Sequence, residues 1–220
     1  MADYTLYYWP VPFRGEFVRA ILAHQGASVD EPDSDAIAAM MAADPQDQPI
    51  PHMAPPMLVQ TATGKAVAQM PAICLWLGRT LDLLPSDPHE AACAIKLAGD
   101  ANDVLDEMTL DGGKSMWTAQ TWADYQPRLR RWMGIWEASP LADPLSQILA
   151  ATLWGTMTER LPALRPLLEA EAPGVAALAD RLRAEPALAA QAKDSRKRFG
   201  DAWCGGEIEK SLRHVLSIGQ

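Results

Sequence analysis

The first residues that could do chemistry stand close to the N-terminus, in the stretch Tyr-Tyr-Trp-Pro-Val-Pro-Phe-Arg-Gly at positions 7–15. A tyrosine hydroxyl is a neutral hydrogen-bond donor with a pKa of about 10. An arginine guanidinium can hold a carboxylate in a fork. Neighbouring strand residues point to opposite faces, so Tyr7 and Tyr8 cannot both face one site. Core packing is the alternative role for both tyrosines.

The elements around this stretch read as a small α/β unit. Residues 4–8 favour a short strand, which Pro10 and Pro12 end. Apolar residues at helical spacing then predict a helix from Arg14 to a C-cap at Gly26. The chain therefore turns sharply between its first strand and its first helix.

A hairpin and a second helix complete the first 84 residues. Residues 57–60 and 66–69 read as two strands around a turn at 63–65, and Pro71 favours the start of a helix over 72–84. Residues 29–56 allow several readings. Val29 could lie in a short strand and residues 33–43 in a helix, followed by a proline-rich loop at 44–56. A long loop of this kind is often functional.

The composition changes after a linker at 85–89, where strand signals end and Ala, Leu and Trp dominate. Asp143-Pro144 is a typical helix start, with Asp as N-cap and Pro at the first helical position. Helices are expected over residues 90–108, 122–138, 144 towards 159, 173–183, from 186, and 208–216.

Bulk composition argues against several function classes. Hydrophobic residues make up 49% of the 220 residues, enough for a substantial core. The net charge of -9 and the pI of 4.9 disfavour nucleic acid and anionic membrane surfaces as partners. Three widely spaced cysteines form neither a disulfide framework nor a metal site. We expect a cytoplasmic protein without a signal peptide, a membrane span or a bound metal.

In motif order the chain resembles the cytosolic glutathione transferases. Tyr4-Thr-Leu-Tyr-Tyr-Trp-Pro-Val, with Arg19-Ala-Ile-Leu-Ala-His-Gln-Gly downstream, is similar to the start of tyrosine-type members, the pi class in particular. Pro55-Pro56-Met57-Leu58 resembles the family's cis-proline and following strand, and Gln69-Met70-Pro71-Ala72-Ile73 resembles its Gln-Ser-x-x-Ile helix start. These motifs cover most of residues 4–84. Beyond them the resemblance is one of helical character and length.

The resemblance implies a thioredoxin-like α/β domain at residues 1–84 that binds glutathione, and an all-α domain at residues 90–220 that binds the second substrate. It places Tyr8, directly before the aromatic-Pro-Val, as the residue that stabilises the glutathione thiolate. A free thiol has a pKa of about 8.5, and a hydrogen bond to the thiolate lowers that pKa. Arg14 falls where the pi class has an arginine that helps to hold glutathione; a solvated arginine is the alternative.

Two further motifs depart from the family pattern. In the family the residue before the cis-proline pairs with glutathione through its N–H and C=O. Pro55 has no N–H, so one bond is lost if Pro56 is cis, unless Pro55 is itself the cis residue and Ala54 pairs. Gln69 and Met70 fall where the family binds the γ-glutamyl carboxylate at a helix N-terminus. Met70 replaces serine and keeps only a backbone donor.

Several tryptophans could line a second-substrate pocket. Trp9 would lie beside the sulfur, and Trp117 is a further candidate, with core packing as the alternative for both. The resemblance also implies a homodimer in which an acidic residue of the partner meets the glutathione amine. Asp100 and Asp103 lie in the corresponding helix, but a solvated charge is the simpler reading for each.

We therefore expect a homodimeric glutathione S-transferase with a role in detoxification. It would transfer alkyl or aryl groups by attack of the glutathione thiolate on an apolar electrophile, with glutathione as substrate. The alternative is a non-catalytic protein of the same fold that binds an apolar ligand or a protein partner; Pro55 and Met70 favour it. An isomerase that uses glutathione as a cofactor fits the sequence equally.

Overall fold

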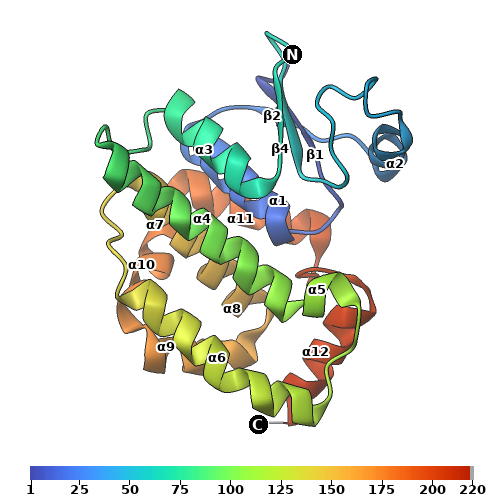
Figure 1. Ribbon diagram of the computed structural model, residues 1–220. Coiled ribbons are helices and arrows are strands. Elements are labelled where there is room, and N and C mark those ends of the chain that lie inside the picture. Colours follow the sequence, from blue (N-terminus) through green and yellow to red (C-terminus); the bar gives the residue numbers. More distant parts are fainter. Residues whose placement is uncertain (219–220) are drawn as a thin grey trace.

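The computed structural model describes residues 1–218, and its N-terminal part is built on a four-stranded sheet (Figure 1). The strand order is β2-β1-β3-β4. Strand β1 (Tyr4–Tyr7) runs parallel to β2 (Val29–Asp30) and antiparallel to β3 (Met57–Gln60), which pairs antiparallel with β4 (Ala66–Ala68). The expected hairpin and the short strand at Val29 are both present.

Three helices accompany the sheet: α1 (Phe13–His24), α2 (Ser34–Ala42) and α3 (Met70–Thr80). Helices α1 and α3 pack against each other, while α2 lies to one side of the sheet (Figure 1). Asp33 caps α2 by accepting the N–H of Ala36 at 2.9 Å, which resolves the ambiguous segment in favour of a helix. The sheet and its helices form the α/β unit that the sequence predicts.

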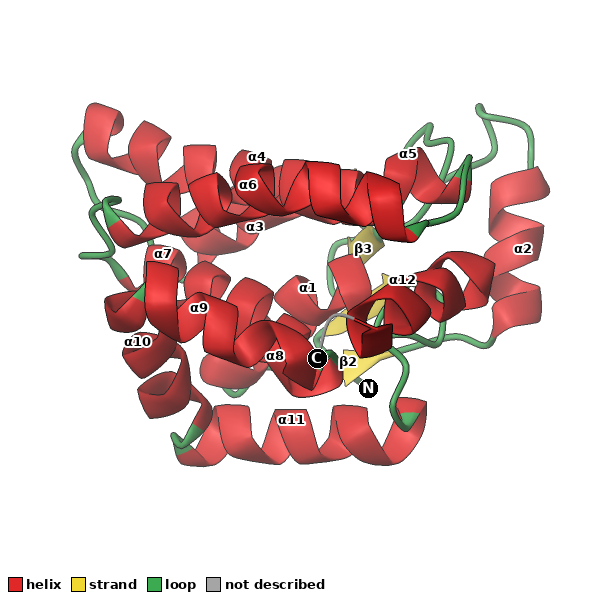
Figure 2. Ribbon diagram, turned by 90° about the horizontal axis from the view of Figure 1, so that it is seen from below, coloured by secondary structure: helices red, strands yellow, loops and turns green. Residues whose placement is uncertain are grey.

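The remainder of the chain is helical, and Figure 2 shows α4 and α6 on the opposite side of the bundle from α11. A π-helical segment (Ala151–Gly155) joins α7 to α8, and a 3-10 turn (Pro162–Leu164) precedes α9. The helices are α4 (Pro88–Met108), α5 (Leu110–Gly113), α6 (Ala119–Glu137), α7 (Pro144–Ala150), α8 (Thr156–Arg160), α9 (Arg165–Glu171), α10 (Pro173–Arg183), α11 (Pro186–Phe199) and α12 (Gly206–Ile218). The fold class predicted from the sequence is confirmed. The last two residues of the expected helical domain, 219 and 220, lie outside the described part.

Proline and its preceding residue mark the helix starts as the sequence suggests. The Asp143 carboxylate accepts the N–H of Ser146 at 2.9 Å and caps α7. Asp87 caps α4 in the same way through the N–H groups of His89 and Glu90. Helix α4 therefore begins at Pro88, inside the stretch expected to be a linker.

A single hydrophobic core runs through both parts of the molecule. It includes Leu6 and Phe17 from the sheet part and Trp136 and Trp154 from the helices. Helix α1 contacts α3, α4, α7 and α11. It is thus the element that joins the sheet to the bundle.

A buried cluster of charges strengthens this junction. Arg19 of α1, 4% exposed, binds Glu31 at 2.7 Å and Glu16 at 3.2 Å, and Arg198 of α11 binds Glu31 at 2.6 Å. Burial opposes ionisation of Glu31, but the hydrogen bonds from Arg19 and Arg198 outweigh it, so the pKa of this carboxyl lies below its usual value. The cluster links α1, the segment after β2, and α11.

Replacing Arg19 by Met should lower the free energy of unfolding by about 3–5 kcal/mol, because the buried Glu16 loses its cationic partner and Glu31 keeps only Arg198 of its two. Urea unfolding measures this. Lys210→Met is the control, since its pair with Glu207 is 73% exposed on both sides and should contribute less than about 1 kcal/mol. The pKa of Glu31 is lowered on folding, so the wild-type advantage should be full above its ordinary pKa of 4.5 and shrink as the pH falls below it. Equal effects of the two substitutions would contradict a stabilising cluster.

Candidate active site

Three segments that lie far apart in the sequence meet at one end of the sheet. In the ladder Tyr7 pairs with Met57, and Met57 pairs with Ala68. One step further along each strand are Tyr8, Pro56 and Gln69, and the N–H of Gln69 donates to the carbonyl of Pro56 at 3.1 Å. The three motifs singled out in the sequence therefore form a row across the sheet end.

The Tyr8 side chain belongs to the buried face of its strand. Burial alternates along β1, with Tyr4 and Leu6 inside and Tyr7 half-buried on the other face. Tyr8 is 5% exposed, and its hydroxyl accepts the backbone N–H of Arg14 at 3.0 Å. A hydroxyl has one proton to donate as well as two lone pairs. Among the described residues, no acceptor takes the proton of the Tyr8 hydroxyl.

The environment keeps this hydroxyl protonated. Burial raises the pKa of Tyr8 to about 12, although the nearby charges of Arg14 and Arg19 lower it in part. At neutral pH the group is a hydrogen-bond donor and not a base. This protonation state suits stabilisation of an anion such as a thiolate.

Arg14 faces the helical bundle. Its Nε donates to Asn102 Oδ1 at 2.8 Å, and its Nη2 forms an ion pair with Asp106 Oδ1 at 3.1 Å, both on α4. A guanidinium carries five N–H donors, and among the described residues Nη1 makes no hydrogen bond. Arg14 thus bridges the two parts of the chain, and its binding of a glutathione carboxylate stays a prediction.

The peptide bond between Pro55 and Pro56 is cis, which confirms the first of the two alternatives drawn from the sequence. Pro55 is then the residue that precedes the cis-proline, and it has no N–H to donate. The carbonyl of Pro56 already accepts from Gln69. Of the two prolines, only Pro55 has a carbonyl that no described residue uses, and it could make the peptide contact that the family resemblance implies.

Gln69 and Met70 differ in the exposure of their side chains. Gln69 adopts a left-handed backbone (φ 74°) at the start of α3, with an exposed side chain. The Met70 side chain is fully buried, and its sulfur accepts the Cys74 thiol at 3.7 Å. Met70 can therefore contact a ligand only through its backbone N–H, at the positive end of the helix dipole.

The two tryptophans proposed for the second-substrate pocket have different surroundings. Trp9 follows Tyr8 and is half-buried. Trp117 is 5% exposed, donates its Nε1–H to the carbonyl of Met108 at 3.0 Å, and packs against Trp122. For Trp117 the structure shows the core packing that was the alternative.

The structure also shows the surroundings of Asp100 and Asp103, the two acidic candidates on α4. Asp100 is 9% exposed and pairs with Lys96 on its own helix, whereas Asp103 is exposed. Contact of either with a glutathione amine stays a prediction.

Gly15 is a site residue that the sequence did not reveal. A Cβ atom at this position would lie 2.3 Å from Cδ1 of Tyr8, far inside van der Waals contact. Only glycine allows the tyrosine ring to lie against the first turn of α1. A glycine in that turn, where it weakens helix formation, was the available signal.

The segment that includes β2, α2 and the loop before the cis-proline is poor in cations. Residues 20–64 contain no lysine or arginine but six acidic residues, Asp30, Glu31, Asp33, Asp35, Asp44 and Asp47. A ligand with two carboxylates would therefore depend on Arg14 and on helix N-termini. The absence of lysine and arginine is visible in the sequence. Its relevance to the site follows only from where the folded chain places this segment.

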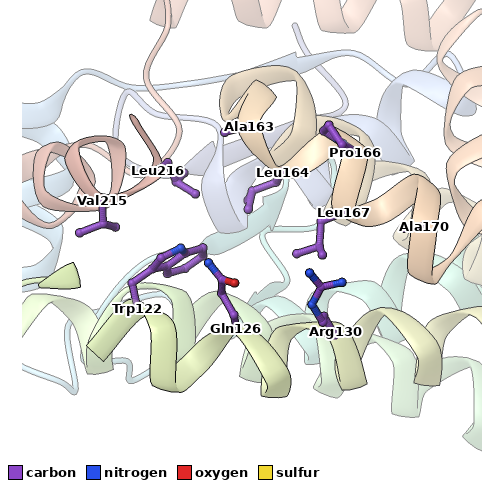
Figure 3. A pocket seen from close by; sticks show the side chains of 10 residues that line it. All are labelled: Trp122, Gln126, Arg130, Ala163, Leu164, Pro166, Leu167, Ala170, Val215 and Leu216. Atoms are coloured by element: carbon purple, nitrogen blue, oxygen red, sulfur yellow. The ribbon is translucent and has the colours of Figure 1, made fainter. Parts of the chain in front are cut away.

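Cavities lie both at the sheet end and away from it. One of about 220 Å³ adjoins the site and is lined by Tyr8, Pro10, Glu31, Pro32, Asp33, Ser34, Ile37 and Arg198. The other, of about 300 Å³, lies between α6, α9 and α12 and shares no residue with the sheet end (Figure 3). It is lined by Trp122, Gln126, Arg130, Ala163, Leu164, Pro166, Leu167, Ala170, Val215 and Leu216.

Within residues 1–218, no group of three or more His, Cys, Asp or Glu side chains is arranged to hold a metal ion. None of the helices in that range is both long enough and apolar enough to cross a membrane.

A thioredoxin-like sheet with a cis-proline, followed by a helical bundle, defines the glutathione-transferase type of fold. A family model described as the glutathione S-transferase C-terminal domain matches residues 93–215, more than half of the chain. The protein belongs to the glutathione S-transferase family. None of the curated proteins matches it significantly in sequence.

Solved structures agree with this assignment. A glutathione S-transferase from Methylobacterium radiotolerans in complex with glutathione sulfonate is 25% identical (TM-score 0.61), over 86% of this chain and 93% of that one. The transferase Ure2p5 from Phanerochaete chrysosporium, cocrystallized with 1-(S-glutathionyl)-2,4-dinitrobenzene, is 15% identical (TM-score 0.69), over 90% and 96%. The pi-class enzyme of Onchocerca volvulus is 15% identical (TM-score 0.68), over 89% and 94%.

Replacing Gly15 by Ala should lower the free energy of unfolding by about 1–3 kcal/mol, because the added methyl group overlaps the Tyr8 ring. Chemical denaturation measures the change. Gly99→Ala is the matched control, since a Cβ there meets no atom within 4 Å, and it should stabilise α4 by about 0.4–1 kcal/mol. Stabilisation by both substitutions would mean that the ring does not lie against Gly15.

Proposed function

We propose that the protein is a glutathione S-transferase that adds the glutathione thiolate to an apolar electrophile. The observation that carries this proposal is the state of Tyr8. Its hydroxyl is held by the Arg14 N–H, stays protonated at neutral pH and lies at the end of the sheet beside a cis-proline. A neutral donor fixed in this way lowers the pKa of a bound thiol by stabilising its anion.

The other site residues would hold the peptide. The backbone N–H of Met70 at the start of α3, together with Gln69, would bind the γ-glutamyl carboxylate. The Pro55 carbonyl would accept from the cysteinyl N–H, and Arg14 would meet the second carboxylate through the donors that Asn102 and Asp106 leave unused. Residues 1–84 would then form the glutathione-binding domain and residues 90–220 the second-substrate domain.

Ligands of two similar structures support this proposal, since one was solved with glutathione sulfonate and another with a glutathionyl conjugate of dinitrobenzene. We further propose that the protein acts as a homodimer in the cytoplasm, where conjugation would serve detoxification. Its net charge of -9 argues against a nucleic-acid partner.

The Tyr8→Phe variant should lose about 10- to 100-fold in kcat/KM, because a hydrogen bond to a charged group contributes about 1.5–3 kcal/mol. The pKa of the bound glutathione thiol should rise by about one to two units. Ultraviolet titration of the thiolate and conjugation of 1-chloro-2,4-dinitrobenzene measure the two effects.

Tyr7→Phe is the matched control for this experiment, since Tyr7 lies on the other face of β1, and it should leave both quantities near wild type. If turnover of Tyr8→Phe equals that of wild type, the catalytic assignment is wrong.

A non-catalytic binding protein is the second candidate, and specific observations favour it. Pro55 lacks the N–H that would pair with glutathione, Arg14 is engaged with Asp106, and residues 20–64 supply no cation. The cavity of about 300 Å³ beside Trp122 could take an apolar ligand (Figure 3).

Calorimetry with glutathione separates the two candidates. A transferase should bind glutathione with micromolar to millimolar affinity, and Arg14→Ala should weaken binding at least about tenfold through loss of a charge-assisted contact. Asp106→Asn is the control, since it leaves the guanidinium in place without its anionic partner and should bind at least as tightly as wild type. Absence of binding by wild type would favour the second candidate.

A further inference from the structure

The helical part of the chain holds a cavity that the proposed transferase chemistry does not use (Figure 3). Its volume is about 300 Å³, and it lies between α6 on one side and α9 and α12 on the other. A cavity of this size can enclose a small molecule. The chemical character of its two walls therefore indicates what it could bind.

The α6 wall is polar at one end and apolar at the other. Trp122, Gln126 and Arg130 follow at intervals of four residues, which places them on one face of the helix. Figure 3 shows all three side chains pointing into the cavity, with the Trp122 ring next to Val215 and Leu216 of α12. Because Gln126 and Arg130 carry the hydrogen-bonding groups, the wall changes from polar to apolar towards α12.

The polar end keeps donors that the protein does not use. Nη1 of Arg130 binds the carboxylate of Glu171 at 2.6 Å, and no other acceptor for this guanidinium lies among residues 1–218. The two side chains are 46% and 35% exposed, and such a pair is weak. The Gln126 amide likewise makes no hydrogen bond within the described part of the chain. Arg130 and Gln126 can therefore both donate to a ligand.

The opposite wall is apolar and continues beyond this cavity. Leu164, Leu167 and Leu216 point towards α6 (Figure 3). A second cavity, of about 270 Å³, shares Ala163 and Leu216 with the first and is lined further along by Leu161. The two cavities therefore adjoin and form one apolar path that is longer than either.

Only one end of this path offers free charge. Arg213 borders the second cavity, but its guanidinium already donates to Glu209 and to the carbonyls of Arg160 and Asp201. Arg130, at the other end, has a single partner. A ligand with one anionic head and an apolar chain matches this arrangement, because a carboxylate accepts several N–H groups and the chain removes apolar surface from water.

We propose that the two adjoining cavities form a binding site for a fatty acid. Its carboxylate binds Arg130 and Gln126, and its chain runs between Trp122 and Leu164 towards Leu161. The site lies outside the row formed by Tyr8, Pro56 and Gln69, so the inference does not depend on the proposed function.

Calorimetry with decanoate, in the absence of glutathione, tests the site on the full chain. Arg130→Gln should weaken decanoate binding at least about tenfold, because a charge-assisted contact is lost. Arg131→Gln is the matched control, since it removes the same charge from the neighbouring, exposed position outside the cavity, and it should bind as wild type does. 1-Decanol has the same chain without the charge, so Arg130→Gln should leave its binding unchanged.

The chain length of the ligand tests the apolar path. Decanoate should bind more tightly than hexanoate by up to about fourfold per added methylene group, the factor that full burial of a methylene group gives. Ala163→Phe places a ring where the two cavities adjoin. This variant should lose most of the advantage of decanoate over hexanoate.

Three results would overturn the inference. Wild type may show no binding of decanoate at millimolar concentration. Arg130→Gln and Arg131→Gln may weaken binding equally, which would indicate a general effect of surface charge. Binding lost in Arg14→Gln but kept in Arg130→Gln would place the fatty acid at the end of the sheet.

Discussion

The hydrogen bond from the Arg14 N–H to the Tyr8 hydroxyl is the contact on which the site depends. It ties the end of β1 to the first turn of α1, and Gly15 lets the ring approach that turn. The same helix joins the rest of the molecule, since the Arg14 side chain reaches α4 and the Arg19 side chain reaches Glu31, which Arg198 of α11 also binds. The site and the junction of the two parts are therefore built on one element.

Electrostatics set the character of this site. The chain is acidic overall, and Arg14 and Arg19 are each paired with carboxylates. What remains for an anionic ligand is a neutral phenol with a raised pKa, helix N-termini and the unused donors of Arg14. Under the proposed function, such a site would stabilise a thiolate through fixed dipoles, which need little reorganisation when the charge forms.

The C-terminal part of the chain packs against the turn between β1 and α1. Glu209 gathers the backbone donors of the turn before α12 and brings Trp203 and Gly205 against Phe13 and Val11. A buried carboxylate with four hydrogen-bond donors is strongly held. Residues nearly 200 positions apart thus come to share one surface.

Proline and capping residues act locally, so most elements and their order follow from the sequence: Asp143-Pro144 starts α7 and Pro173 starts α10 as expected. Three short motifs also sufficed to indicate the fold and to place a cis bond near Pro56. Only the tertiary structure shows which side chains already have hydrogen-bond partners within the protein. Arg14 was expected to hold a glutathione carboxylate or to be a solvated arginine; on folding it binds Asn102 and Asp106 on a distant helix, and its contact with glutathione stays a prediction. For Gly15 the sequence offers only a glycine in a helical turn, because its role arises from a contact with the Tyr8 ring that forms only on folding.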